Sequence, residues 1–465
     1  MLRSPAERGV SKHGLRLAPA ALPAFLALLA ALVLAAPAGA QEPAADLRPG
    51  FYVGVAPCAS SLCHGAAAPR GDFDALQDEY FTWLDRDPHS GAFEVLASED
   101  SRRIAANYGL TVPAYEAPAC LACHTLVVPP ALQARPVEVE DGISCEACHG
   151  PAGGWLAGHH TAEWTHADSV AAGLVDLDAA ATRAAVCLGC HLGDGERRVD
   201  HGLLAAGHPQ LVFELDNYAA DMPPHWPPAA SFSRPERAAR LAGSRGAGAW
   251  AVGQAAAFRA GLEEIAWTAE SGRWPELSLM RCEDCHHGLA ERRWARREAP
   301  RRPLGLPRWS PARWVVLRHL VDAFAPTERD GLDRRVAAVA AGVSRLGPAP
   351  PGLAADAAAA AAALDAVAAR LAEVRWDEAR VGALLVRLAA DRAAVADRES
   401  AEQVMLALNT LTSELLALRA GPPPAGLVAD LEAMDRLLDA PYDFDPQAFD
   451  ARLLSFERRA REVTR

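Results

Sequence analysis

The sequence is poor in lysine, in long apolar runs, and in cysteine outside one recurring pattern. Lys12 is the only lysine among 465 residues, while alanine, arginine, glycine and proline are abundant, which indicates codon bias. The net charge is −13 and no basic tract suits a nucleic-acid backbone, so we expect no nucleic-acid partner. No second apolar stretch of membrane-spanning length follows residue 40. We therefore expect no stable membrane span in the mature chain.

The N-terminus has the pattern of an export signal. A basic start precedes an apolar run from about Leu17 to Ala36, and Ala38-Gly39-Ala40 offers a small-residue cleavage site. We predict a signal peptide over residues 1–40 and a periplasmic mature chain that begins near Gln41. An uncleaved membrane anchor is the alternative, because the apolar run approaches transmembrane length. No cysteine lies near the cleavage site, which argues against a lipid anchor.

All ten cysteines fall into five pairs, and a histidine follows the second cysteine of every pair. Four pairs have the spacing Cys-x-x-Cys-His, whereas the first, from Cys58 to His64, contains two extra residues. Two thiols at this spacing bond covalently to the vinyl groups of haem, and the adjacent imidazole is the proximal ligand of the iron. Zinc sites and disulfides are alternatives for paired cysteines, but neither explains the recurring histidine.

The motifs therefore predict five covalently attached haem c groups. The predicted attachment residues are Cys58, Cys63, Cys120, Cys123, Cys145, Cys148, Cys187, Cys190, Cys282 and Cys285. The predicted proximal iron ligands are His64, His124, His149, His191 and His286.

The sixth ligand of each iron separates an electron carrier from a possible catalyst, because a second histidine gives a low-spin carrier and an open position admits a substrate. Eight histidines between the signal peptide and residue 308 lie outside the motifs: His89, His159, His160, His166, His201, His208, His225 and His287. We predict that the distal ligands are His89, His159, His201, His208 and His225, which stand in distinctive contexts such as Asp87-Pro88-His89. The alternative role for each is a hydrogen bond to a haem propionate or to the backbone. His287 directly follows a proximal ligand and is the weakest candidate.

The character of the chain changes near residue 308. Before it, glycine, proline, cysteine and histidine are frequent, and one helix is predicted from about Trp250 to Ser271, with Phe258, Leu262, Ile265 and Ala266 on a shared face. We predict a loop-rich multihaem domain with short helices over residues 41–308, in which haem supplies the apolar core. Residues 309–465 are predicted to form an all-α helical bundle, so the whole protein is expected to be mainly α.

Three apolar stripes at helical spacing support the predicted bundle. They are Leu364, Val367, Leu371 and Val374; Val381, Leu384, Leu385 and Leu388; and Val404, Leu408, Leu411 and Leu415. Breaks are expected at Pro348–Pro351, Pro422–Pro424 and Pro441.

Three local features in and near the predicted bundle also carry expectations. The last helix is expected to start with Asp445 as cap, Pro446 in the first turn, and Phe444 packed against Phe449. Ala357–Ala363 is either a strong helix former or a partly disordered low-complexity stretch. Arginines between Arg292 and Arg318 either bind haem propionates or an acidic partner, or form a solvated helix face.

Several segments resemble periplasmic multihaem c-type cytochromes related to the tetrahaem electron carriers of nitrification. The resemblance rests on Gly142–Pro151, the Cys58…His64-Gly65 opening and Trp155…His159, while Ala205–Leu211, Pro223–Trp226 and Trp274–Leu277 resemble an uncharacterised pentahaem branch. It covers roughly residues 51–310. It implies haems stacked in close pairs, electron flow along the row and mostly two histidines per iron. The fifth motif and the long helical tail depart from the tetrahaem carriers, so their docking partner is not transferred.

Two enzyme classes of this broad group do not fit the chain. Pentahaem nitrite reductase uses a lysine as proximal ligand of its catalytic haem, and the predicted mature chain contains no lysine. Octahaem hydroxylamine oxidoreductases carry more attachment motifs than the five found here.

We therefore predict a periplasmic electron-transfer protein with bis-histidine haems and no substrate chemistry of its own. Its expected partners are redox proteins, such as a quinol dehydrogenase or another cytochrome. One alternative is a multihaem oxidoreductase in which one open iron acts on a small nitrogen or sulfur species. Another is an electron-transfer subunit of a larger respiratory complex, with the helical tail as interaction module.

Overall fold

The computed structural model describes residues 47–70, 75–228, 235–243, 245–286, 307–345, 347–419, 425–439 and 444–464. In these ranges every regular element is a helix, and Tyr52–Gln133 and Met280–Trp309 form isolated β-bridges. The predicted mainly α fold class is confirmed. The predicted signal peptide, His287, Pro422–Pro424 and Pro441 lie outside the described residues.

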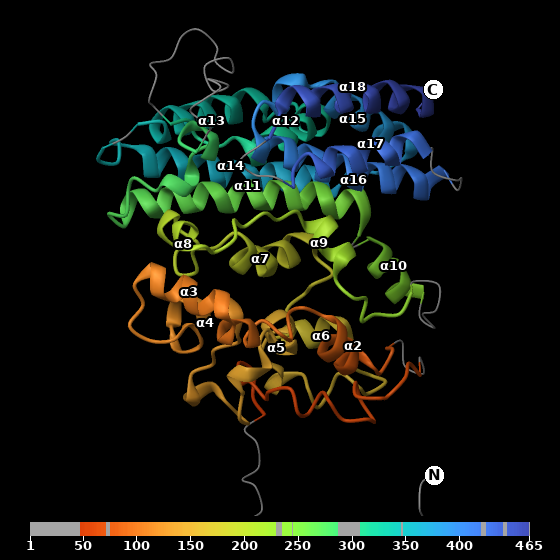
Figure 1. Ribbon diagram of the computed structural model, residues 1–465. Coiled ribbons are helices and arrows are strands. Elements are labelled where there is room, and N and C mark those ends of the chain that lie inside the picture. The colour runs from red at the N-terminus through yellow and green to blue at the C-terminus, as the bar shows by residue number, and fades with distance from the viewer. Residues whose placement is uncertain are drawn as a thin grey trace, which may run out of the picture. The chain divides into compact units, whose positions relative to one another are not determined.

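The N-terminal part consists of short helices joined by long loops (Figure 1). These helices are α2 (Glu79–Arg86), α3 (Glu99–Tyr108), α4 (Pro118–His124), α5 (Cys145–His149), α6 (His166–Ala171), α7 (Ala180–His191), α8 (His201–Ala206), α9 (Leu215–Asp221) and α10 (Pro235–Gly243). Frequent glycine and proline in this region limit helix length, since both disfavour helix interiors.

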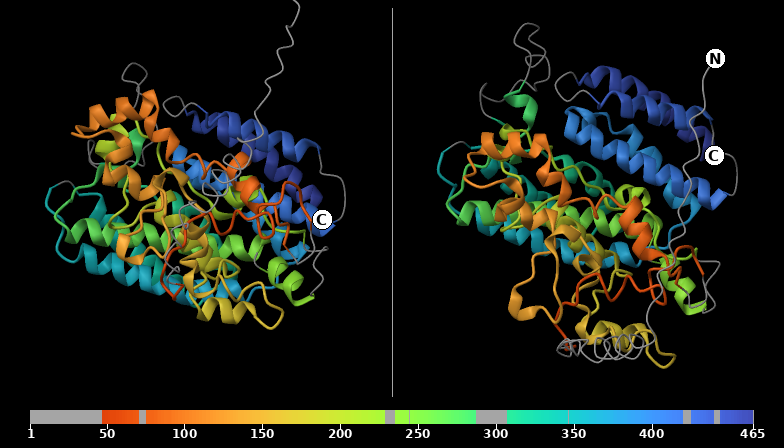
Figure 2. Two further views of the ribbon diagram at one scale, coloured as in Figure 1. Left: turned by 90° about the horizontal axis from the view of Figure 1, so that it is seen from below. Right: turned by 60° about the horizontal axis from the view of Figure 1, so that its bottom comes forward.

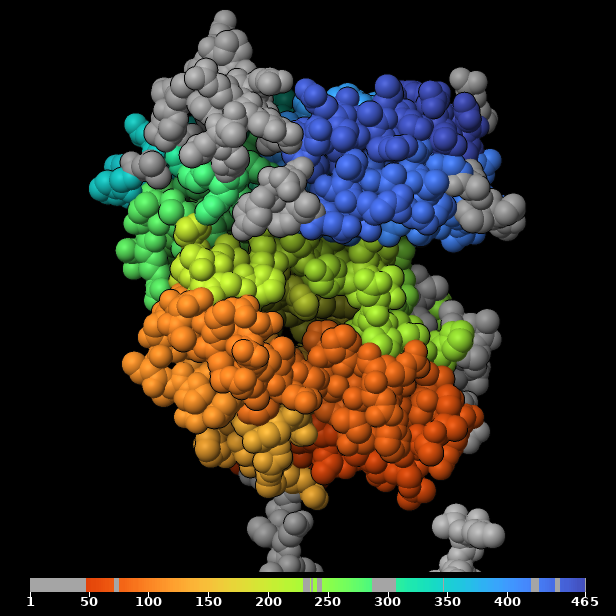
Figure 3. All heavy atoms as spheres, in the orientation of Figure 1, coloured from red at the N-terminus to blue at the C-terminus, as the bar shows by residue number. Residues whose placement is uncertain are grey.

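Buried apolar side chains form only small clusters in this N-terminal part. One cluster contains Leu96, Ala105 and Ala114, and another contains Val53, Ala152 and Trp155. The molecular surface is hollowed between the segment near residue 100 and the segment that follows residue 200 (Figure 3). The polypeptide alone therefore does not build a continuous apolar core here, in agreement with a region organised around prosthetic groups.

The long helix α11 (Gly246–Glu270) connects the two parts of the fold. It contains the predicted helix, and Phe258, Leu262 and Ile265 of the predicted face are buried. On one side α11 packs against α7 and α9, and on the other it packs against α12, α14 and α16 (Figure 1). The domain boundary near residue 308 stays a prediction, and α11 shares its apolar core with the helices that follow that boundary.

Seven α-helices follow residue 308 in the described part of the chain. They are α12 (Ala312–Phe324), α13 (Arg329–Val343), α14 (Leu353–Ala372), α15 (Glu378–Ala390), α16 (Arg398–Arg419), α17 (Ala425–Arg436) and α18 (Pro446–Val463). The predicted stripes on α15 and α16 are buried, as are Leu364, Val367 and Leu371 on α14. Val374 differs, because α14 ends before it. α17 and α18 lie side by side (Figure 2).

Two local predictions for the bundle are confirmed. Asp445 caps α18 by accepting hydrogen bonds from the N–H groups of Gln447 and Ala448, and the Phe444 and Phe449 rings lie 5.8 Å apart. The alanine run 357–363 forms part of α14, where Ala357, Ala360 and Ala361 are buried. Alanine suits this helix because it has the highest helix propensity and allows close packing.

Candidate haem-binding sites

Three attachment motifs lie on α-helices that orient their side chains. Cys120–His124 ends α4, Cys145–His149 forms α5, and Cys187–His191 ends α7. Residues three and four positions apart share a helix face, so both thiols and the imidazole of each motif lie on one side. The fifth motif begins on the 3-10 turn Cys282–Asp284. All ten cysteines are free thiols, so the structure does not support the disulfide alternative.

Each motif histidine faces a second histidine from a distant part of the chain. The ring centroids lie 6.2 Å apart in His64–His159, 6.5 Å in His124–His208, 6.4 Å in His149–His225, 6.0 Å in His191–His89 and 6.2 Å in His286–His201. The structure thus brings every predicted proximal histidine together with one predicted distal histidine.

The spacing of these pairs fits a metal ion held between two imidazoles. Metal–nitrogen bonds are about 2 Å long and a ring nitrogen lies about 1 Å from its ring centre, so a linear site separates the centroids by about 6 Å. The angle between the ring planes varies from 10° to 87° while the separation stays between 6.0 and 6.5 Å. A bridging atom explains a constant distance at variable angle better than direct ring packing, in which distance and angle change together.

Hydrogen bonds at Nδ1 orient several of these rings. The Nδ1 atom of His64 lies 3.0 Å from Oε2 of Glu79, and Nδ1 of His89 lies 2.8 Å from Oδ1 of Asp87. When Nδ1 donates its proton in this way, Nε2 keeps the lone pair that binds a metal. Backbone carbonyl oxygens at 2.8 Å take the same position for three other rings: Ala92 for His124, Leu156 for His159 and Pro209 for His208.

Burial and carboxylates shift the pKa values of these imidazoles in opposite directions. Burial lowers the pKa of His149 to about 4, which keeps this ring neutral as metal binding requires. The hydrogen bonds to Glu79 and Asp87 raise the pKa values of His64 and His89. A carboxylate partner also increases the electron donation of an imidazole to a bound metal.

The attachment cysteines of different motifs lie close to one another. The thiol of Cys58 is within hydrogen-bonding reach of Cys145, and the thiol of Cys123 is within reach of Cys190. In addition, α4 packs on α7. The first attachment site therefore lies beside the third, and the second lies beside the fourth.

Two further contacts connect these pairs of sites. Cys148 of the third motif lies near Cys187 of the fourth. Burial is the main cause that raises the pKa of the Cys148 thiol to about 12, and the nearby Cys187 thiol adds to the rise. Helix α8 begins at His201, and His208 follows its end, so one short helix connects the histidine partners of the fifth and second motifs. The five sites are thus connected in the order first, third, fourth, second, fifth.

Glu146 ties the first attachment site to the third. It lies between the two cysteines of the third motif, and its buried carboxylate accepts hydrogen bonds from the backbone N–H groups of Val53, Gly54 and Ala152 at 3.1, 2.8 and 2.7 Å. Burial raises its pKa although these donors oppose the shift. Val53 and Gly54 lead into the first motif, so this carboxylate fixes one motif against the other.

His160 and His166 are the remaining described histidines outside the motifs before residue 308, and neither pairs with a motif histidine among the described contacts. His160 packs against its neighbour, and Nε2 of His166 lies 3.1 Å from Oδ1 of Asp176. Together with Asp178, His166 and Asp176 form the one group of metal-ligand spacing found in the described residues, but Asp178 also pairs with Arg240. This group contains no cysteine, so the structure does not support the zinc alternative.

Sequence reasoning missed Glu79, Asp87 and Glu146. Asp87 stands two residues before His89 and Glu146 lies inside a motif, so spacing offered a signal for both. Glu79 is 15 residues from His64 and left no such signal.

Two arginines of the predicted cluster between Arg292 and Arg318 form ion pairs. Arg308 pairs with Asp284 of the fifth motif, and Arg318 pairs with Asp391.

Residues 59–150 match the family model described as cytochrome c554 and c-prime. The matched segment contains the second and third motifs and the end of the first. Among the curated proteins and the solved structures, nothing matches the chain. Over the matched segment the chain is similar to a multihaem c-type cytochrome family, which supports covalently attached haem c and a role in electron transfer.

Proposed function

We propose that this chain is a periplasmic pentahaem c-type cytochrome that transfers electrons, with two histidines on each iron. The observation that carries the proposal is the pairing of all five motif histidines with five other histidines at 6.0–6.5 Å. Bound haem would supply one-electron redox chemistry. The ten cysteines would attach the five groups, and the ten paired histidines would coordinate the irons.

The chain's own residues would set the properties of each site. Glu79 and Asp87 hold the rings of His64 and His89 through Nδ1 and place negative charge next to them. Both effects favour the oxidised state of a bound iron. These carboxylates lie at the first and fourth sites, so neighbouring sites would differ in reduction potential.

The connected order of the sites supports transfer along a row. The first and the fifth sites form its two ends, and Cys63, Cys282 and Cys285 at these ends are exposed, whereas the cysteines of the three inner sites are partly buried. Redox partners would therefore reach the row at its ends. We propose redox proteins as partners, such as a quinol dehydrogenase or another cytochrome.

The enzyme alternative requires an iron without a second histidine ligand. The structure offers a histidine partner to each of the five motif histidines, which favours the electron carrier.

The small number of exposed apolar side chains on the helical tail favours a role as a cap of the haem-bearing part. In its described residues the exposed large apolar side chains are Leu418 and Leu454, and the remaining large apolar residues pack inward or are partly covered. An interaction module would expose a larger apolar face. No helix in the described ranges has the length and apolar character of a membrane span.

The test is a haem count and an EPR spectrum of the protein purified from a host that exports and matures c-type cytochromes. We expect five haems per chain, all low-spin, and a mature N-terminus near Gln41 by mass spectrometry. A haem count below five would contradict the pentahaem assignment. A persistent high-spin ferric signal that shifts on adding nitrite, hydroxylamine or cyanide would favour the oxidoreductase instead.

A further inference from the structure

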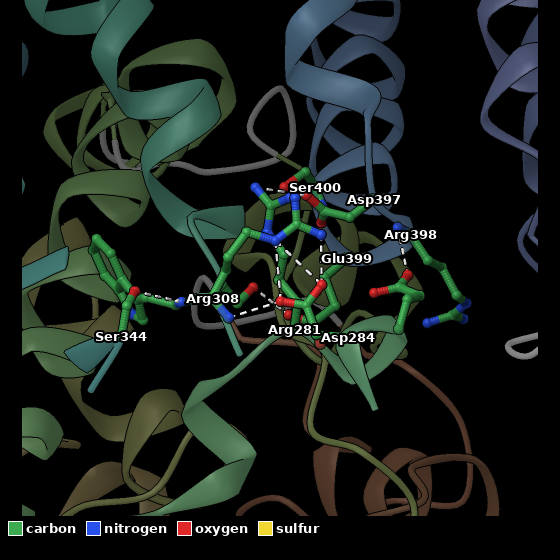
Figure 4. Close-up of polar contacts among 11 residues, drawn as sticks. Arg281, Asp284, Arg308, Ser344, Asp397, Arg398, Glu399 and Ser400 are labelled. Carbon is green, nitrogen blue, oxygen red and sulfur yellow. Dashed lines mark hydrogen bonds and ion pairs between the residues drawn. The ribbon is translucent and has the colours of Figure 1, made fainter. Parts of the chain in front are cut away.

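The fifth attachment motif is held by residues of the C-terminal bundle. The Arg281 guanidinium lies 3.2 Å from Oδ2 of Asp397, and Oε1 of Glu283 accepts a hydrogen bond of 2.9 Å from the backbone N–H of Arg398. Figure 4 shows Arg281, Asp397 and Arg398 at the amino end of α16. The loop between Cys282 and Cys285 is thus anchored to a helix that starts more than 100 residues later.

A second anchor comes from the residues just before α12. The Asp284 carboxylate accepts hydrogen bonds from the backbone N–H of Arg308 at 2.7 Å and from its Nε at 3.0 Å (Figure 4). The backbone N–H of Arg281 donates to the Arg308 carbonyl at 2.8 Å. Both residues between the motif's cysteines therefore have partners outside the motif: Glu283 at the start of α16, and Asp284 just before α12.

Glu399 brings a carboxylate to the attachment sulfur itself. Its Oε1 lies 3.1 Å from Sγ of Cys282, and Oε2 accepts a hydrogen bond from the Ser310 hydroxyl. A thioether sulfur cannot donate a proton, so after haem attachment the carboxylate would keep Ser310 and Gln210 as donors and would lie beside the attachment sulfur.

The same carboxylate reaches the second haem site. The Gln210 side-chain amide donates to Oε1 of Glu399 at 3.0 Å, and Gln210 lies two residues after His208, the partner of His124. Glu399 therefore stands where the second and fifth sites adjoin.

We propose that the amino end of α16 completes the fifth haem site, and that the Glu399 carboxylate lowers the reduction potential of the haem attached at Cys282 and Cys285. The inference rests on the proposed function. A negative charge close to a partly desolvated iron centre stabilises the ferric state over the ferrous state, because the ferric state carries one more positive charge. The helical tail thereby tunes a redox site in addition to covering it.

The charges around Glu399 determine how large this effect is. Partial burial raises the pKa of Glu399, and Asp397 adds to the rise, whereas Arg313, whose own pKa burial lowers to about 10, is a nearby cation. Replacing Glu399 with glutamine removes one negative charge and leaves Asp397 and Arg313 in place. We therefore expect the reduction potential to rise.

The test compares Glu399→Gln with Glu402→Gln in the full-length holoprotein, by potentiometric titration of the haem bands at about pH 8, which lies above the ordinary range of carboxyl pKa values. Glu402 is the matched control, because it is a partly buried carboxylate one turn further along α16 that pairs with Arg398, whereas Glu399 contacts the attachment sulfur. His201→Met identifies the fifth haem, since methionine either coordinates the iron and raises its potential or leaves that haem high-spin.

We expect Glu399→Gln to keep five low-spin haems and to raise the potential of the haem identified by His201→Met. The expected rise corresponds to a change of about ten-fold in the ratio of oxidised to reduced fifth haem, which is about 59 mV for one electron. Glu402→Gln should leave that potential unchanged. Five unmoved potentials, a shift confined to another haem, or an equal shift in Glu402→Gln would overturn the inference. A wild-type protein with fewer than five haems would instead contradict the proposed function.

Discussion

The carboxylate of Glu79 accepts the Nδ1 hydrogen bond of His64 across 3.0 Å. Its other oxygen accepts a hydrogen bond of 2.8 Å from the backbone N–H of Leu76, so both carboxylate oxygens are hydrogen-bonded. Burial opposes ionisation of Glu79, but the hydrogen bonds from His64 and the backbone outweigh it and lower the pKa of this carboxyl. The first candidate haem site therefore contains a fixed anion that is hydrogen-bonded to its predicted proximal histidine.

We predict that Glu79→Gln raises the reduction potential of the first haem. Glutamine keeps a hydrogen-bond acceptor but removes the charge, so the imidazole donates less electron density to the ferric iron. The expected rise is on the order of 50 mV, equivalent to about 1 kcal/mol. Potentiometric titration would measure it, with Asp85→Asn on the same helix as exposed control. Equal shifts in both variants would show a general charge effect and contradict a role of the hydrogen bond.

We predict that His208→Ala opens the second iron site. His208 is the residue that faces His124, so its loss leaves one iron with a single histidine ligand. EPR should show that one of the proposed haems changes from low spin to high spin while the others are unaffected. His160→Ala is the control, because His160 packs against His159 and not against a motif histidine. A spectrum of His208→Ala that stays entirely low-spin would mean that this pair does not hold an iron.

We predict a pH-dependent stability term at Glu264 on α11. Burial raises the pKa of this carboxyl from 4.5 to about 7, although Oε1 lies 2.9 Å from the Arg198 guanidinium; Glu276 and Asp194 add to the rise, and Thr268 opposes it. Because the folded-state pKa lies above the unfolded value, the protonated carboxyl favours the folded state. This contribution is fully present below about pH 4.5 and is lost as the pH rises through 7.

Between pH 5 and pH 8 the wild type should therefore lose on the order of 2 kcal/mol of unfolding free energy relative to Glu264→Gln. Denaturant unfolding followed by far-UV circular dichroism at several pH values would measure this difference. Glu263→Gln is the control, because Glu263 is exposed on the same helix and pairs with Arg259. Parallel pH profiles of wild type and Glu264→Gln would show that Glu264 does not titrate in this range.

Local sequence signals were sufficient to predict most of the helical bundle, and they also defined the candidate attachment residues. The cap at Asp445 and the buried stripes on α15 and α16 depend on residues a few positions apart, and the structure has them where they were predicted. The five histidines chosen as distal candidates also stand in local contexts that singled them out. Short-range patterns carry this information because caps, helix faces and covalent attachment are themselves short-range.

The pairing of the sites could not be predicted in the same way. Nothing near His89 indicates that its partner is His191, and nothing near Cys282 indicates a carboxylate 117 residues away at Glu399. These contacts depend on packing between elements far apart in the sequence, such as α4 on α7 and α11 on α16, which apolar periodicity predicts only as buried faces. The order of the sites and the polar anchors of the fifth motif therefore required the fold.

We predict that Glu146→Ala destabilises the part of the fold that contains the first and third sites. The substitution leaves the buried N–H groups of Val53, Gly54 and Ala152 without their acceptor. Each unsatisfied buried donor costs about 1 kcal/mol or more, so the loss should be on the order of 3 kcal/mol. Glu146→Gln keeps one acceptor oxygen and should lose less. Guanidinium unfolding of the holoprotein would measure both, with Glu116→Ala as exposed control. A Glu146→Ala midpoint equal to that of the control would show that water replaces the carboxylate and that Glu146 does not hold the two motifs together.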